Sequence, residues 1–136
     1  IKGRHNIYNH FDTILKDAEK SVVIMTTAQG LVRKVEGLKQ TLEKLKKKGV
    51  NVRIAAPFTK DNATAVKSLK GIAEVRHTDT NARFCIVDGK QLAFMTHNDE
   101  AVHPSNDISI WVNTPFFASA LQGMFDEQWK GMKPLK

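Results

Sequence analysis

The sequence predicts an α/β fold, a single domain in which one mixed β-sheet is flanked by helices on both faces. Three observations support this prediction. A strand, a long amphipathic helix and a second strand follow one another over residues 21–56, and such a unit places its two strands parallel in one sheet. A tight hairpin over residues 84–95 adds antiparallel strands. A closing helix after Thr114 and Pro115 supplies another helical layer.

The first half of the chain alternates helices and strands. Apolar residues over 6–20 recur at helical spacing, which predicts the first helix. Residues 21–27 form a nearly continuous apolar run rich in β-branched side chains, which predicts a strand buried on both faces. A second helix is predicted from about 31 to 48, where Gly49 follows, and residues 50–56 form the next predicted strand.

The apolar face of that second helix has two interpretations. It consists of Leu31, Val35, Leu38, Leu42 and Leu45. The spacing resembles a coiled-coil seam, which would make the helix a dimer contact. Packing on the sheet is the usual use of such a face and is the favoured interpretation.

The second half begins with a weaker helix and changes to antiparallel structure. Residues 61–69 predict the short helix and residues 73–78 a short strand. Residues 84–87 and 92–95 flank Asp88-Gly89, a dipeptide favoured in hairpin turns. Residues 107–112 alternate apolar and polar side chains, which predicts a further strand.

The last helix carries a broad apolar face that we expect to be core. Its members are Phe116, Phe117, Ala120, Leu121, Met124, Phe125 and Trp129. Helical spacing favours packing against the sheet, and the alternative is a surface that binds a partner.

Size and composition fit one globular domain with no membrane segment. The 136 residues are 41% hydrophobic and 26% charged, and no apolar run approaches the roughly 20 residues of a membrane helix. The single cysteine, Cys85, lies in an apolar run, which fits a buried thiol in the reducing cytoplasm. No signal peptide is visible, and because the chain begins with Ile1 and not with Met, we interpret it as part of a longer protein.

A formal net charge of +7 raises the possibility of a polyanionic partner. Much of the excess lies in Lys44, Lys46, Lys47 and Lys48, immediately before Gly49. Cations there complement the negative end of a helix, so a solvated helix end is favoured over a nucleic-acid-binding patch.

Five polar residues form a motif around the hairpin. Asn81, Arg83 and Asp88 stand at offsets i, i+2 and i+7, and Thr96 and Asn98 follow after a further seven residues. This spacing resembles the His-x-Lys-x4-Asp motif of phospholipase D enzymes and the Gly-Ser-x-Asn that follows it.

The resemblance extends over essentially the whole chain. Ile86-Val87-Asp88-Gly89, the segment from Ile110 to Pro115 and the helix ending in Phe125 and Trp129 are similar to the C-terminal phospholipase D-like domain of archaeal TrmB-type transcriptional regulators. It implies a phospholipase D-like fold for residues 1–136.

The resemblance also implies which residues form a site. In active phospholipase D enzymes the histidine attacks phosphorus, and the neutral amide of Asn81 cannot do so. Arg83 keeps the positive charge of the lysine and has a planar fork suited to phosphate or carboxylate. Asp88 and Asn98 match the family pattern, and Thr96 replaces its serine. We therefore expect these five residues to bind a ligand without cleaving it.

Each motif residue also has a purely structural interpretation. Asp88 is explained equally well as the first residue of a turn. Arg83 on a strand is, on general grounds, more often an outward-facing surface residue. Asn81 would tolerate an unusual loop dihedral angle.

A polar loop follows the motif and suggests a metal site only weakly. His97, Asn98, Asp99, His103 and Asp107 offer imidazole and carboxylate groups. They match no known metal motif, and such a composition is ordinary for a connection between strands, so no metal and no cofactor is predicted. Asp107 is interpreted as the first residue of a strand.

Three functions remain open. The favoured one, implied by the resemblance, is a non-catalytic effector-sensing and dimerisation domain of a transcriptional regulator, with a DNA-binding helix-turn-helix upstream. Its effector would be a small molecule, with a sugar as one candidate, and dimerisation is expected because family members with one motif per chain resemble halves that pair. The alternative is a phospholipase D-class phosphodiesterase or nuclease that uses His97 as an atypical nucleophile. The third is nucleic-acid binding by the lysine-rich helix end.

Overall fold

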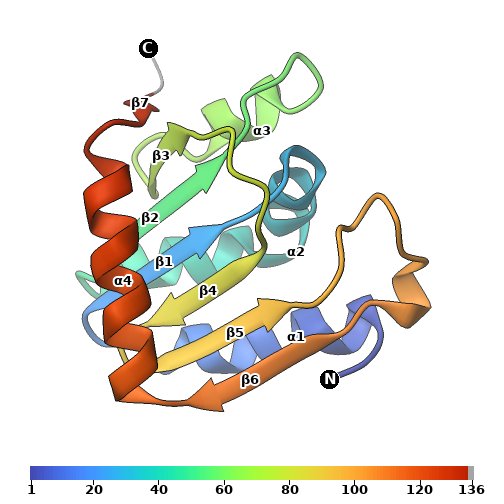
Figure 1. The fold of residues 1–136 in the computed structure, drawn as a ribbon. Coiled ribbons are helices and arrows are strands. Elements are labelled where there is room, and N and C mark those ends of the chain that lie inside the picture. The colour runs from blue at the N-terminus through green and yellow to red at the C-terminus, as the bar shows by residue number, and fades with distance from the viewer. Residues whose placement is uncertain (135–136) are drawn as a thin grey trace.

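A seven-stranded mixed sheet forms the centre of the computed structural model, which describes residues 1–134 (Figure 1). The strands are β1 (Ser21–Met25), β2 (Asn51–Ala56), β3 (Glu74–His77), β4 (Phe84–Val87), β5 (Gln91–Met95), β6 (Ser109–Asn113) and β7 (Lys133–Pro134). Their order across the sheet is β6-β5-β4-β1-β2-β3-β7. The β1, β2 and β3 strands are parallel, and every other pairing is antiparallel. The predicted mixed sheet is confirmed.

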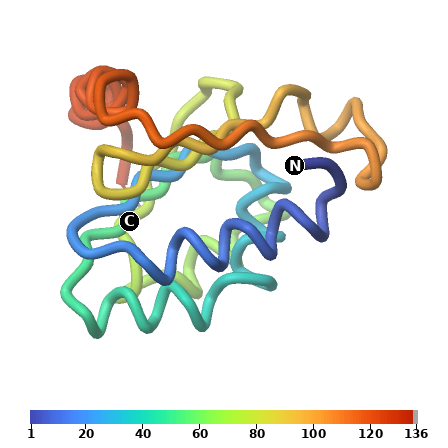
Figure 2. The backbone as a smooth tube through the Cα atoms, turned by 90° about the horizontal axis from the view of Figure 1, so that it is seen from below, coloured from blue at the N-terminus to red at the C-terminus, as the bar shows by residue number. Residues whose placement is uncertain are grey.

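Helices cover both faces of the sheet, as the sequence predicts (Figure 2). The helices α1 (Arg4–Lys16), α2 (Ala28–Lys47) and α3 (Ala63–Ser68) pack on one face. The helix α4 (Pro115–Trp129) lies alone on the other face. A short 3-10 helix, η1 (Pro104–Asn106), interrupts the long loop between β5 and β6.

The α2 helix begins three residues earlier than predicted. Thr27 caps its N-terminus because the Thr27 hydroxyl accepts a hydrogen bond from the backbone N–H of Gly30. The leucines of its apolar face are buried against the sheet, with Val35 partly buried beside them. This face therefore forms core and does not serve as a coiled-coil seam.

Alternation along β1 divides the core into two parts. Val22 and Ile24 belong to the cluster under α1, α2 and α3, whereas Val23 and Met25 belong to the cluster under α4. The prediction of a strand buried on both faces is confirmed. Cys85 is buried as predicted, and burial raises the pKa of its thiol to about 12.

The prediction that the whole apolar face of α4 is core is wrong in part. Ala118 and Phe125 are buried, but Phe116 is 89% exposed, Met124 66% and Phe117 55%. A helix lying on a sheet buries one stripe of its surface, and the apolar residues of α4 extend beyond that stripe. The short β7 strand was also not predicted.

The lysine-rich end of α2 has a structural contact. The ammonium group of Lys48 donates hydrogen bonds to the carbonyl oxygen of Ala18 at 2.9 Å and to that of Lys16 at 3.2 Å, at the end of α1. Lys46 and Lys47 are exposed. None of the helices within residues 1–134 has the length and apolar composition needed to cross a bilayer.

Candidate functional site

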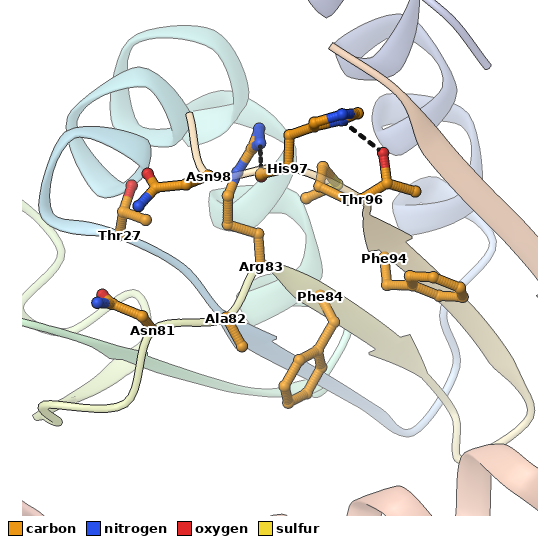
Figure 3. Close-up of a pocket in the computed structure, with 10 residues that line it drawn as sticks. Thr27, Asn81, Ala82, Arg83, Phe84, Phe94, Thr96, His97 and Asn98 are labelled. Carbon is orange, nitrogen blue, oxygen red and sulfur yellow. Dashed lines mark hydrogen bonds between the residues drawn. The ribbon is translucent and has the colours of Figure 1, made fainter. Parts of the chain in front are cut away.

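Four of the five motif residues line one cavity. Asn81, Arg83, Thr96 and Asn98 surround a space of about 360 Å³ at the end of the sheet where β4 begins and β5 ends (Figure 3). This volume lies at the lower end of the range of about 300–1,000 Å³ that ligand pockets occupy. Thr27, which caps α2, lines the cavity as well.

The hairpin register explains why these residues meet. Phe84 pairs with Phe94 across β4 and β5, so the residues before β4 lie beside the residues after β5. The backbone N–H of Met95 accordingly donates a hydrogen bond to the carbonyl oxygen of Arg83 at 2.9 Å. Thr27 joins them because β1 runs antiparallel to β4 and ends beside its start.

Arg83 is buried and already paired, in contrast to the surface position favoured from sequence. Its Nη1 and Nη2 atoms donate to the two carboxylate oxygens of Asp107 at 3.0 and 2.5 Å, and Nη1 also donates to the carbonyl oxygen of His97 at 2.9 Å. Burial lowers the pKa of Arg83, and the negative charge of Asp107 opposes that shift. The guanidinium fork is therefore occupied by the protein itself.

The partner of Arg83 was missed from the sequence. Asp107, interpreted there as the first residue of a strand, is fully buried and also accepts a hydrogen bond from Arg4 Nε at 3.2 Å. The carbonyl oxygen of Asp107 accepts a further bond from the N–H of Gly3 at 2.8 Å. Asp107 thus connects the cavity with the beginning of α1.

Asp88 lies apart from the other four motif residues, at the opposite end of β4. Its carboxylate accepts backbone N–H bonds from Glu19 at 3.0 Å, Lys20 at 2.7 Å and Ser21 at 3.0 Å. Burial by itself would raise the pKa of Asp88, but these three donors outweigh it and the pKa is lowered. These contacts fix the segment between α1 and β1 to the turn after β4, so the Asp88 side chain has a structural role, as the turn interpretation expects.

The backbone of Asp88 supports the same interpretation. Asp88 has a φ of 56°, and no other residue except glycine among the described residues has a positive φ. Aspartate tolerates this left-handed conformation, which a two-residue hairpin turn requires. The unusual dihedral angle considered for Asn81 is not observed.

The polar loop after β5 is held in place by Asp99. Asp99 accepts a hydrogen bond from the Thr27 hydroxyl at 2.6 Å and is paired with Arg33. Burial would raise the pKa of Asp99, but these bonds outweigh it and lower the pKa. Within residues 1–134 no three His, Cys, Asp or Glu side chains converge on a possible metal position.

The cavity combines polar groups with apolar side chains. Its polar lining consists of the amides of Asn81 and Asn98, the hydroxyls of Thr27 and Thr96, the imidazole of His97 and the paired Arg83. Its apolar lining consists of Ala82, Phe84, Phe94 and Met95. In Figure 3, Asn81, Thr27 and Asn98 lie to one side of Arg83, and Thr96 and His97 to the other. No carboxylate lines the cavity among the described residues.

His97 lacks the support that a nucleophilic histidine needs. Its ring is exposed, and Nδ1 lies 2.8 Å from the hydroxyl of Thr96. A catalytic imidazole is normally oriented by a carboxylate or a carbonyl group, and within the described residues no such hydrogen bond to His97 is present. The other histidine of the loop, His103, instead contacts Ser105.

A comparison with protein-family models matches residues 1–133 to the family described as transcriptional regulator TrmB, EBD N-terminal subdomain. No curated protein matches the chain.

Solved structures share the fold at low sequence identity. TrmBL2, described as an archaeal chromatin protein, is 15% identical over 99% of this chain with a TM-score of 0.74, and this chain spans about half of it, 53%. Nuc from Salmonella typhimurium, described as a phospholipase D family member, is 16% identical with a TM-score of 0.70 and coverage of 92% and 88%. NucT from Helicobacter pylori is 12% identical with a TM-score of 0.76 and coverage of 97% and 92%. These structures confirm the predicted phospholipase D-like fold.

Proposed function

Because the chain belongs to the TrmB family of transcriptional regulators, we propose that it is a non-catalytic effector-sensing and dimerisation domain whose ligand binds beside Arg83. The buried pair between Arg83 and Asp107 is the observation that carries this proposal. This ion pair occupies the guanidinium group that would otherwise bind a phosphate. Asn81 stands where phospholipase D enzymes have their nucleophile, and an amide cannot take that role. The remaining cavity is suited to binding, and His97 in its lining has no orienting carboxylate or carbonyl group among the described residues.

The proposed ligand is an uncharged molecule rich in hydroxyl groups, of which a sugar is the simplest example. The amides of Asn81 and Asn98 offer both donors and acceptors, and the hydroxyls of Thr27 and Thr96 offer the same. Phe84 and Phe94 provide apolar contact for the less polar side of such a ligand. A charged sugar phosphate would find no unpaired lysine or arginine among the described residues that line the cavity.

Asp107 could couple ligand binding at Arg83 to the position of the N-terminal segment. A ligand that contacts Arg83 acts on the same carboxylate that binds Arg4, and the backbone N–H of Ser109, two residues after Asp107, donates to the carbonyl oxygen of Ile1 at 2.8 Å. In this proposal a DNA-binding helix-turn-helix precedes Ile1, and ligand binding favours one of two arrangements of a dimer. An archaeal source and a cytoplasmic location belong to the same proposal.

Thermal unfolding with matched ligands tests the proposal. We expect glucose or sucrose to raise the melting temperature, because a ligand that binds only the native state adds about 2.7 kcal/mol at 100 times its Kd. Glucose 6-phosphate should raise it less than glucose. The increase should be lost in Asn98→Ala and kept in Asn51→Ala, which changes an exposed asparagine at the opposite end of the sheet.

Two outcomes would contradict the proposal. One is a larger effect of glucose 6-phosphate than of glucose, which would mean that the cavity selects negative charge. The other is an equal response of Asn98→Ala and the parent chain, which would place the ligand elsewhere.

A further inference from the structure

The hydroxyl group of Thr27, in the wall of the cavity, already has two hydrogen bonds within the chain. It donates to Oδ2 of Asp99 at 2.6 Å and accepts from the backbone N–H of Gly30 at 2.9 Å. A hydroxyl group has one proton and two lone pairs. Thr27 therefore has one lone pair left for a ligand, and its proton is not available.

The direction of the bond between Thr27 and Asp99 follows from the charge of Asp99. Burial raises the pKa of this carboxyl group, but the bonds from Thr27 and Arg33 lower it by more, so Asp99 is ionised at neutral pH. An ionised carboxylate can only accept hydrogen bonds. The proton between the two side chains consequently belongs to Thr27 and points toward Asp99.

Asp99 holds this arrangement from behind the cavity wall. Its side chain is 1% exposed and is not among the described residues that line the cavity, although its partner Thr27 and its neighbour Asn98 are. Oδ2 of Asp99 is also paired with Arg33, whereas Oδ1 is buried and has no hydrogen-bond partner within residues 1–134. Hydrogen bonds to an ionised acceptor are about twice as strong as bonds between neutral groups. A ligand would have to break such a bond to turn the Thr27 proton toward itself.

Asn98 offers the opposite polarity on the same side of the cavity. Its Oδ1 atom accepts from the backbone N–H of Glu100 at 3.0 Å, which an amide nitrogen could not do. This bond fixes the orientation of the amide and makes Nδ2, with its two protons, the free end. Thr27 and Asn98 both lie to one side of Arg83 (Figure 3). That side therefore presents an acceptor from Thr27 and donors from Asn98.

We propose that Asp99 determines the ligand specificity of the cavity, because it makes Thr27 an acceptor that only a ligand O–H or N–H group can satisfy. This inference rests on the proposed function, in which the ligand binds beside Arg83. The capacity of a hydroxyl group both to donate and to accept is reduced at Thr27 to accepting alone. Asp99 is a positioning residue, since it acts on the ligand through Thr27.

The arrangement selects a chemical class of ligand. A hydroxyl group or a primary amide can donate to Thr27 and accept from Asn98. A carboxylate, phosphate or ether oxygen has no proton to donate and would place its lone pairs against that of Thr27. A site built to bond a ligand proton discriminates against analogues that lack it, because its own polar group is then left unpaired.

The hydroxyl proton of Thr27 gives a test that needs no ligand. Because the carboxylate of Asp99 holds this proton, we expect it to exchange slowly with water and to give a resolved NMR resonance with a cross-peak to the Thr27 methyl group. The resonance should be absent from Asp99→Ala. It should remain in the control Asp79→Ala, which removes a carboxylate that is 95% exposed. Circular dichroism would verify that both variants are folded.

Two small probes test the selectivity. Ethylene glycol can donate and accept, whereas 1,2-dimethoxyethane can only accept. We expect the amide resonance of Thr27 to respond about two- to tenfold more strongly to ethylene glycol, which corresponds to the net strength of one hydrogen bond. Thr27→Val should lose this response and Thr27→Ser should keep it. In Asp99→Ala the freed hydroxyl can donate, so dimethoxyethane should act as well, which its larger size alone would not explain.

The outcomes separate this inference from sugar binding. A parent chain without the hydroxyl resonance, a resonance that persists in folded Asp99→Ala, or equal responses to the two probes would overturn the role of Asp99, even if glucose raises the melting temperature. The expected resonance together with the preference for ethylene glycol would support it, even if glucose has no effect.

Discussion

Replacing Asp107 by Asn should reveal how strongly the cavity depends on its buried ion pair. The side chain of Asp107 is 1% exposed and that of Arg83 is 7% exposed, so the substitution leaves a guanidinium buried without its counter-charge. Removing one partner of such a pair costs about 3–5 kcal/mol. This is a large share of a total stability of about 5–15 kcal/mol. In a chain of this length, we expect the melting temperature to fall by roughly 10–20 °C.

Urea unfolding followed by circular dichroism at pH 7 measures the effect. The double variant Arg83→Met/Asp107→Asn should lose less than the sum of its single variants, because it leaves fewer buried charges without a partner. The control Asp79→Asn changes a carboxylate that is 95% exposed and should alter stability by no more than about 0.5 kcal/mol. A loss below about 1 kcal/mol for Asp107→Asn would refute the reasoning that Asp107 neutralises Arg83.

Three further predictions follow from single contacts. Asp88→Asn should lower the free energy of unfolding by about 1–2 kcal/mol at pH 7. Because the pKa of Asp88 is lowered in the fold, the carboxylate stabilises the native state above its unfolded pKa. In urea titrations this stabilisation should vanish as the pH falls through the folded pKa. Cys85, with its pKa near 12, should be labelled by a disulfide reagent at pH 8 only as fast as the chain opens, and labelling at the rate of a free thiol would contradict its burial. Gly30→Ala should cost about 1–3 kcal/mol in the same urea assay, because the added carbon would lie 2.1 Å from the Thr26 hydroxyl, and an unchanged midpoint would show that this contact relaxes.

Local patterns predicted most of the fold because each depends on neighbouring residues. The β-branched run from Val22 to Ile24 and the Asp88-Gly89 turn carry their own structural preferences, and both predictions are confirmed. The extent of the α4 core was not predictable in this way. Helical spacing places Phe116 and Phe117 on a broad apolar face. Only the three-dimensional arrangement shows that nothing within the described chain covers them.

The hairpin predicts which polar residues meet at the candidate site, but the sequence does not predict how its charged side chains pair. The spacing of Asn81, Thr96 and Asn98 around a tight turn is sufficient to bring them together. The partner of Arg83 lies 24 residues further along the chain, and Asp107 before an alternating strand has an ordinary local explanation. Only the folded chain shows that Asp107 pairs with Arg83, so the guanidinium fork is not free for the phosphate or carboxylate group suggested from the sequence.

The most direct test of a ligand-binding domain without hydrolytic chemistry is the release of p-nitrophenol from bis(p-nitrophenyl) phosphate by the purified chain. With an amide at Asn81 and no carboxylate orienting His97 within residues 1–134, we expect no release above the buffer rate and no phosphate adduct in the intact mass. Release that exceeds the buffer rate and disappears in His97→Ala would show that the chain is a phosphodiesterase.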